Sequence, residues 1–315
     1  MRTHPHTTRS SLMLEVASQL VKRKDWPYLQ ARVSLREQGS NDWPVNLFAS
    51  DSPVAIHEVA SGQVQFATIN PSMILKLAAL GSTPFKNPIP LRIIAVLPAL
   101  DQMVFAVKQE TGLTSFTDIR ERRFPLKVSL RGQPDHSLHV IIDHVFSAAG
   151  FSLDDILSWG GKVRYDAGMP YGPNRIGAVQ RGEIHAIFDE GVSAWGNMAL
   201  QMGMKFLSLD EPLLQRLEAV GLRRGLIEKR NFPQLASDVL TLDFSGWPIY
   251  THRDTQDTLV ADFCAALQAS KNRIPWAQKA PLPLAQMVRD TPEGHLEVPL
   301  HPAAEKFWRE LGYLK

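Results

Sequence analysis

Residues 59–67 read Val59-Ala60-Ser61-Gly62-Gln63-Val64-Gln65-Phe66-Ala67, and residues 179–187 read Val179-Gln180-Arg181-Gly182-Glu183-Ile184-His185-Ala186-Ile187. The two stretches lie about 120 positions apart and place the same features in the same order: the end of a helix, a Gly, and a short apolar strand. A period this long exceeds the roughly 20 to 50 residues of solenoid repeats. Helix–Gly–strand punctuation also arises by chance, but this degree of similarity favours two α/β lobes of the same architecture.

Each copy runs into a polar turn, which is Asn70-Pro71-Ser72 in the first and Asp189-Glu190-Gly191 in the second. Open α/β sheets bind ligands in the crevice outside the carboxyl ends of their strands. We therefore expect the two turns to face one cleft between the lobes.

Length and composition agree with two lobes and exclude several classes of protein. The chain has 315 residues, more than the roughly 250 to 300 at which a single core usually stops growing. Lys and Arg number 34 against 32 Asp and Glu, and a net charge of +2 is too small to indicate a nucleic-acid partner. The single cysteine, Cys264, excludes an internal disulfide and any multi-thiolate metal site. No apolar run approaches the roughly 18 residues of a membrane span, so we expect no direct membrane insertion.

Hydrophobic periodicity predicts alternating strands and helices. Strands are expected at 30–38, 64–69, 91–97, 103–107, 126–130, 163–165, 184–188, 206–209 and 239–244. Helices are expected from residue 12, from residue 53, and at 71–80, 115–119, 138–149, 173–180, 192–201, 255–269 and 302–312.

The pattern restarts at Ser115, as it should where a second lobe begins. The sequence therefore predicts an α/β fold of two lobes, with a hinge between the lobes. Residues 1–106 plus 240–315 are expected to form lobe 1, and the inserted residues 107–239 are expected to form lobe 2.

The strongest ligand signal is a pair of polar turns, 6–11 and 131–137, each of which leads into a predicted helix. Helix N-termini carry unpaired N–H groups and attract carboxylates, and an arginine binds a carboxylate with two hydrogen bonds. The alternative is that Ser, Thr and Asp merely cap these helices. We favour a ligand, and expect a positive cleft that binds a small carboxylate. The residues predicted to line the cleft are Thr8, Arg9, Ser10, Asn70, Ser72, Arg131, Gln133, His136, Ser137, Asp189 and Glu190.

A metal or nucleotide site has weaker support. His136, His139 and Asp143 share one face of a predicted helix, and His144 is adjacent, but no HExxH motif is present. Surface or capping histidines explain this set better. The chain has no Walker loop, GxGxxG, GxSxG or kinase signature, so we expect no cofactor and no bound metal.

The C-terminal segment reads Val298-Pro299-Leu300-His301-Pro302-Ala303-Ala304-Glu305-Lys306-Phe307-Trp308-Arg309-Glu310. It resembles the Pro-Leu-His-Pro-Gly-Ala-x-x-Tyr-Tyr-Arg-Glu ending of TAXI-type solute-binding proteins, the receptors of TRAP transporters. Segments 104–108 and 112–119 resemble the family's crossover strand and its Gly-Ile-x-Ser-Leu-x-Asp-Leu segment. Segment 182–186 resembles its Gly-x-Ile-Asp-Ala, with His185 in place of Asp. The family's Gly-Gly-x-Tyr turn is absent, and residues 6–11 stand in its place.

The resemblance implies the two-lobed type II periplasmic-binding-protein fold. It also implies a monomeric receptor whose lobes close over a small organic acid or amino acid, with TRAP membrane subunits as possible partners. Such a receptor is periplasmic if an upstream signal peptide is missing from this chain, and the protein is cytoplasmic if Met1 is the true start. The same scaffold also carries enzymes. One alternative is a cytosolic decarboxylase of an aromatic dicarboxylic acid, with His136 or His6 as the acid/base. Enzymes of thiamine-pyrimidine synthesis are disfavoured, because they require a cysteine-rich motif.

Overall fold

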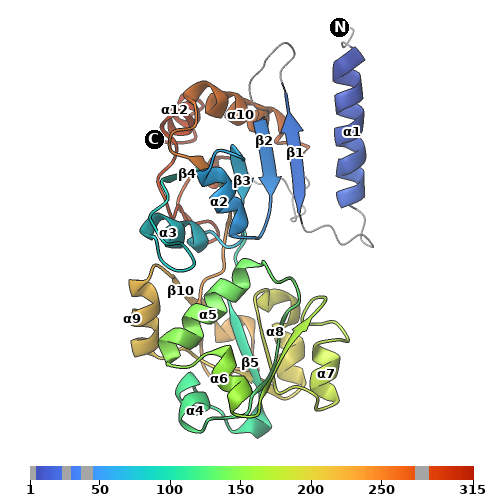
Figure 1. The fold of residues 1–315 in the computed structure, drawn as a ribbon, viewed down its shortest axis with the longest axis vertical. Coiled ribbons are helices and arrows are strands. Elements are labelled where there is room, and N and C mark those ends of the chain that lie inside the picture. The colour runs from blue at the N-terminus through green and yellow to red at the C-terminus, as the bar shows by residue number, and fades with distance from the viewer. Residues whose placement is uncertain (1–4, 23–29, 37–44, 274–283) are drawn as a thin grey trace.

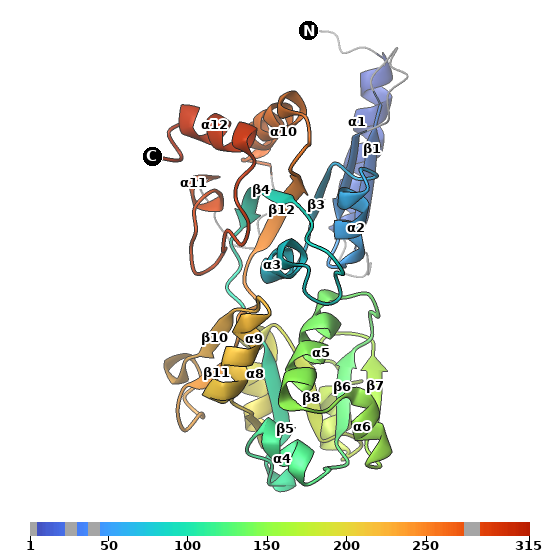
Figure 2. The same ribbon diagram turned by 60° about the vertical axis from the view of Figure 1, so that its left-hand side comes forward.

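The structure, a computed structural model, describes residues 5–22, 30–36, 45–273 and 284–315, with only the backbone of residues 5–8 (Figure 1). Its strands form two five-stranded mixed sheets and a separate two-stranded ribbon. The sheets occupy opposite ends of an elongated molecule, one above the other in Figures 1 and 2. Together with their helices they form the two α/β lobes that were predicted.

The sheet of lobe 1 has the order β1-β2-β3-β12-β4, in which β2 and β3 are parallel and the other neighbours are antiparallel. Its strands are β1 (Ala31–Leu35), β2 (Val45–Ala49), β3 (Phe66–Thr68), β4 (Leu91–Leu97) and β12 (Trp247–His252). Its helices are α1 (Pro5–Val21), α2 (Val54–Ala60), α3 (Met73–Leu80), α10 (Asp257–Ser270), α11 (Leu284–Met287) and α12 (Pro302–Glu310). Strand β4 is mostly buried because helices cover both faces of the sheet, in agreement with its continuous apolar sequence.

The sheet of lobe 2 has the order β7-β6-β8-β5-β9, with β6 parallel to both β7 and β8. Its strands are β5 (Val104–Lys108), β6 (Lys127–Arg131), β7 (Lys162–Asp166), β8 (Ala186–Asp189) and β9 (Met204–Phe206), and the ribbon consists of β10 (Arg224–Ile227) and β11 (Val239–Leu242). Its helices are α4 (Phe116–Glu121), α5 (Ser137–Ala149), α6 (Leu153–Ser158), α7 (Ile176–Gln180), α8 (Val192–Gln201) and α9 (Glu211–Ala219), with short 3₁₀ turns η1 (Gln109–Thr111) and η2 (Lys229–Asn231).

Two segments cross between the lobes, one from β4 to β5 and the other from β11 to β12. They hydrogen-bond to each other: the Met103 N–H donates to the Leu242 carbonyl at 2.9 Å, and the Phe244 N–H donates to the Asp101 carbonyl at 2.9 Å. We call these paired segments, 98–103 and 243–246, the hinge. The predicted lobe boundaries near residues 106 and 240 fall beside it and stay a prediction.

The sequence repeat corresponds to a repeated structure. Helices α2 and α7 each end just before a glycine in the left-handed region, Gly62 (φ 76°) and Gly182 (φ 71°). The N–H of each glycine donates to the carbonyl three residues earlier at 3.1 Å, and the next N–H donates to the carbonyl five residues earlier at 2.9 Å. Strands β3 and β8 follow. The duplicated architecture predicted from these segments is therefore confirmed at the level of local structure.

The N-terminal helix departs from the prediction. A helix was expected from residue 12 behind a polar turn, but α1 begins at Pro5, a residue suited to the first helical position. Residues 6–11 are therefore helical and form no turn. Helix α1 lies beyond edge strand β1, with its N-terminal end at the end of lobe 1 remote from lobe 2 (Figures 1 and 2).

Candidate functional site

The carboxyl ends of β6 and β8 meet at one edge of the lobe 2 sheet, because these strands are parallel neighbours. Arg131 ends β6, and Asp189 and Glu190 follow from β8. One guanidinium nitrogen of Arg131 donates to Asp189 Oδ1 at 2.6 Å and also to Glu190 Oε1. The other lies 3.0 Å from Nε2 of His136, the N-cap of α5. The sequence placed these four residues at the cleft, and the structure brings them into direct contact.

A second arginine completes this cluster and was not predicted from the sequence. Arg175, the N-cap residue of α7, forms an ion pair with Asp189 Oδ2, and neither side chain exposes any surface. Its Nε donates to the Ser129 hydroxyl at 3.0 Å. The Ser129 hydroxyl in turn donates to Asp166 at 2.7 Å. Asp189 is therefore held from both sides by guanidinium groups.

The burial and the charges of the cluster shift the pKa values of Arg131 and His136. Burial acts to lower the pKa of Arg131, but the carboxylates of Asp189 and Glu190 outweigh burial and raise that pKa. Burial, with the positive charge of Arg131, lowers the pKa of His136 to about 3. His136 is therefore neutral near pH 7. Its Nδ1 accepts a hydrogen bond from the Leu138 N–H at 3.1 Å.

Lobe 1 contributes Asp51, in the turn after β2. The backbone N–H and the hydroxyl of Ser137, at the start of α5, both donate to the Asp51 carbonyl, at 3.0 Å and 2.6 Å. This contact joins the lobes directly. Burial raises the pKa of the Asp51 carboxyl to about 6, while Arg131 opposes and Glu190 and Asp135 add to that rise.

The hinge contributes Asp101. Its two carboxylate oxygens accept hydrogen bonds from the Gly191 N–H at 3.0 and 2.9 Å. Burial, together with a hydrogen bond and charge repulsion from Glu190, raises the pKa of Asp101 to about 9. Asp101 is therefore protonated near pH 7, and its carboxyl group lies beside that of Glu190.

The prediction of a positive cleft is wrong for the described residues. Even with Asp101 protonated, the carboxylates of Asp51, Asp189 and Glu190 outnumber the guanidinium groups of Arg131 and Arg175, and both arginines already have acidic partners. Arg9, the second arginine expected there, is exposed on α1. The prediction failed because three charged or acidic residues of the site were not expected there. Asp51 lies in a turn, Asp101 in a crossing segment and Arg175 in a loop, and none of these segments carries a motif.

Three other residues that were predicted to line the cleft, Ser72, Asn70 and Gln133, lie outside the cluster around Arg131. Ser72 is fully buried and donates its hydroxyl to the Ser245 carbonyl at 2.9 Å, so it supports the hinge. Asn70 lies at the cleft edge of β3, and its buried Oδ1 has no hydrogen-bond partner in the described part of the chain. Gln133 lies in the turn after β6, where its carbonyl oxygen is 2.9 Å from Nε2 of His139.

The N-terminal residues that were predicted to line the cleft do not lie at the junction of the lobes. Thr8, Arg9 and Ser10 belong to the first turns of α1, far from lobe 2 (Figure 1). Arg9 and Ser10 are exposed, and the side chains of Thr8 and His6 lie outside the described residues. These residues are good N-caps, which is why the sequence suggested a turn, but the helix starts before them.

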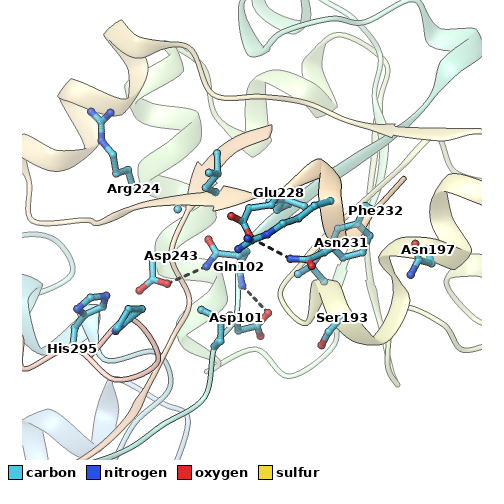
Figure 3. Close-up of a pocket in the computed structure, with 17 residues that line it drawn as sticks. Asp101, Gln102, Ser193, Asn197, Arg224, Glu228, Asn231, Phe232, Asp243 and His295 are labelled. Carbon is cyan, nitrogen blue, oxygen red and sulfur yellow. Dashed lines mark hydrogen bonds and ion pairs between the residues drawn. The ribbon is translucent and has the colours of Figure 1, made fainter. Parts of the chain in front are cut away.

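A separate pocket of about 590 Å³ opens at the hinge (Figure 3). Lobe 1, both hinge segments and lobe 2 contribute to its walls. Its polar residues include Asp101, Gln102 and Asp243 from the hinge, and Phe232 provides an aromatic wall. The pocket contains none of the residues predicted from the sequence.

Among the described residues, no group of three or more His, Cys, Asp or Glu side chains is arranged to hold a metal ion. His144, from the candidate metal set, contacts the Thr83 carbonyl at 2.6 Å. Over the same described ranges, no helix has the length and apolar character of a membrane span.

The solved structures similar to this chain include substrate-binding proteins of ABC transporters. Lactococcal OpuAC in complex with glycine betaine is 11% identical, with a TM-score of 0.38 over 83% of this chain and 82% of that one. PhnD1 from Prochlorococcus marinus in complex with methylphosphonate is 11% identical, with a TM-score of 0.37 over 83% of each chain. SsuA from Xanthomonas axonopodis pv. citri, an alkanesulfonate-binding protein, is 13% identical, with a TM-score of 0.27 over 84% of this chain and 71% of that one. These TM-scores are too low to indicate what this chain binds.

No curated protein matches the chain. The model of the NMT1-like family matches residues 44–312, which include both sheets apart from edge strand β1. This chain belongs to the NMT1-like family.

Proposed function

We propose that the protein is a receptor whose lobes close over a small amino-carboxylate, such as an amino acid. The observation that carries this proposal is the pair of Ser137 donors, beside Arg131, that face lobe 1 and bind the Asp51 carbonyl. A ligand carboxylate would take the place of that carbonyl oxygen, because it offers the same donors a negatively charged acceptor. The lobes would then close on the ligand.

The acidic surroundings favour an amino-carboxylate over a simple acid. A carboxylate that approaches Arg131 meets Glu190, which is already bound to it, and Asp51 on the opposite lobe. An ammonium group on the ligand offsets this repulsion and gives both carboxyl groups a partner. The unpartnered Oδ1 of Asn70 supplies a further acceptor at the lobe 1 edge. Ligand binding to both lobes stabilises the closed state by its differential affinity.

We further propose that the protein is a TAXI-type receptor, which delivers its ligand to TRAP membrane subunits from outside the cytoplasm. The C-terminal motif that supports it is structural: His301 caps α12 by accepting from the Ala303 N–H at 3.3 Å, and Trp308 Nε1 donates to the Ile94 carbonyl at 3.0 Å. Transport of the ligand by cells that contain the TRAP subunits, with and without this protein, tests this part. Transport that does not depend on the protein would contradict it.

A decarboxylase on the same scaffold has less support. Burial and Arg131 lower the pKa of His136 to about 3, so the ring is not in the imidazolium form that would act as a general acid near pH 7. We therefore propose binding without turnover.

Calorimetry against a panel of amino acids, dicarboxylic acids and sugars tests the proposal. We expect an amino-carboxylate to bind, and Arg131→Ala to weaken binding by about 2 to 5 kcal/mol because it removes one partner of a largely buried charge pair. Arg181→Ala is the matched control, since Arg181 is exposed and pairs with Glu183 away from the cluster. Sugar binding that Arg131→Ala leaves unchanged would overturn the proposal, and turnover of a bound acid would make the protein an enzyme.

A further inference from the structure

The pocket at the hinge lies beside the cluster proposed to bind the amino-carboxylate, and Asp101 is the one residue of that site that also lines the pocket. His295 comes from lobe 1, Gln102 and Asp243 come from the two hinge segments, and Ile227 and Phe232 come from lobe 2. Figure 3 shows the hinge side chains between His295 at one end and Asn197 of α8 at the other. Because every part that moves during closure contributes to its wall, the shape of this pocket depends on the hinge angle.

Asp243 is the one acidic group of this wall that is both deeply buried and incompletely bonded. The residue is only 4% exposed. Its Oδ1 accepts from the Ser245 hydroxyl at 2.6 Å and from Gln102 Nε2 at 3.3 Å. Its Oδ2 is buried and has no hydrogen-bond partner among the described residues. A buried carboxylate oxygen without a partner is costly, and a ligand donor would remove that cost.

The arginines of the pocket wall do not neutralise Asp243, because each has another acidic partner. Arg224 pairs with Glu211 at 2.9 Å and Glu218 at 2.6 Å, and Arg230 pairs with Glu228 at 2.7 Å. His295 lies 3.3 Å from Asp290. The buried Oδ2 of Asp243 could therefore accept a hydrogen bond from a positively charged donor on a ligand.

The rest of the wall suits an apolar body. Phe232 and Ile227 are buried side chains in the apolar core of lobe 2. They line the pocket beside Leu100 and Pro292. A volume of about 590 Å³ lies in the range of small-molecule sites, which are apolar with a few placed polar groups.

We propose that the hinge pocket is a second binding site, for a small organic cation that joins an ammonium group to an apolar or aromatic body. The ammonium group donates to Asp243, and the body packs against Phe232 and Ile227. The site is distinct from the cluster around Arg131, because Arg131, His136, Arg175, Asp189 and Glu190 do not line the pocket.

Benzylammonium is the probe, and benzyl alcohol is the uncharged control of the same shape. We expect saturable binding of benzylammonium by calorimetry, and binding of the alcohol weaker by about tenfold or more. Asp243→Asn retains an acceptor for Ser245 and should weaken benzylammonium binding by a similar factor. In NMR spectra, the probe's ring protons should show contacts to the Phe232 ring.

Further variants separate this site from the first and from any effect on folding. Ser193→Trp fills the pocket from an exposed position on α8 and should abolish binding, whereas Ser158→Trp, at an exposed position of α6, should leave it unchanged. Arg131→Ala, which tests the proposed receptor function, should also leave benzylammonium binding unchanged. Absence of saturable binding, or binding that is lost in Arg131→Ala and retained in Asp243→Asn, would overturn the proposal.

Discussion

Arg175 and Asp189 form an ion pair in which both side chains are completely buried. Removing one member leaves a charge in the core with fewer partners, and such losses cost roughly 3 to 5 kcal/mol. We therefore expect Arg175→Met to lower the free energy of unfolding by about that amount. Urea denaturation measures it.

Arg181→Ala is the control for this prediction, because the Arg181–Glu183 pair has the same chemistry on the surface. Exposed pairs contribute about 0 to 1 kcal/mol, so the control should change stability little. Equal losses in the two variants would show that Asp189 does not depend on Arg175.

The proton of Asp101 predicts a dependence of stability on pH. The pKa of Asp101 is about 9 in the folded protein, against an ordinary value of 3.8 in the unfolded chain, so between these values the folded chain holds a proton that the unfolded chain lacks. The contribution of this proton falls as pH rises, on the order of 1 kcal/mol per pH unit. Asp101→Asn imitates the protonated form and can still accept from Gly191 and donate to Glu190.

The measurement is the free energy of unfolding of the wild type and of Asp101→Asn at pH 6, 7 and 8. We expect the variant to become more stable relative to the wild type at each step upward. A constant difference between the two proteins would mean that Asp101 is ionised throughout this range.

The two glycines of the sequence repeat should respond alike to the same substitution. Gly62 and Gly182 both have φ near 75°, and no atom lies within 4 Å of a Cβ added at either position. Alanine at each should therefore cost about 1 kcal/mol through backbone strain alone, by similar amounts at the two sites. Asparagine tolerates this conformation and should recover part of the loss. Thermal unfolding of the four variants checks this, and unequal losses would contradict the equivalence of the two turns.

Much of the fold could be predicted from the sequence because its signals are local. The Gly150 stop of α5, the capped start of α4 at Ser115 and the buried run of β4 each depend on neighbouring residues. Strand β12 was missed, since Pro248 argues against a central strand. The structure accommodates this proline because pairing with β3 begins only at Ile249.

The candidate site was predicted only in part, because half of it depends on long-range contacts. Arg131 and Asp189 follow strands, which the apolar patterns reveal. Arg175 follows a turn-forming sequence and meets Ser129, 46 positions away, only in the folded chain. Asp51 belongs to no sequence motif, but its carboxyl group lies near Arg131 of the other lobe. No spacing rule connects these residues.

Ser72 provides the last prediction, since its role in the structure differs from the one its sequence suggested. Its hydroxyl and its N–H both donate to the Ser245 carbonyl, at 2.9 and 3.3 Å, and the side chain is fully buried. Ser72→Ala should therefore lower the free energy of unfolding by about 1 kcal/mol, the typical net value of one hydrogen bond. Affinity for an amino-carboxylate identified by calorimetry should change far less than in Arg131→Ala. A large loss of affinity with unchanged stability would show instead that Ser72 contacts the ligand and that the hinge does not need its hydroxyl.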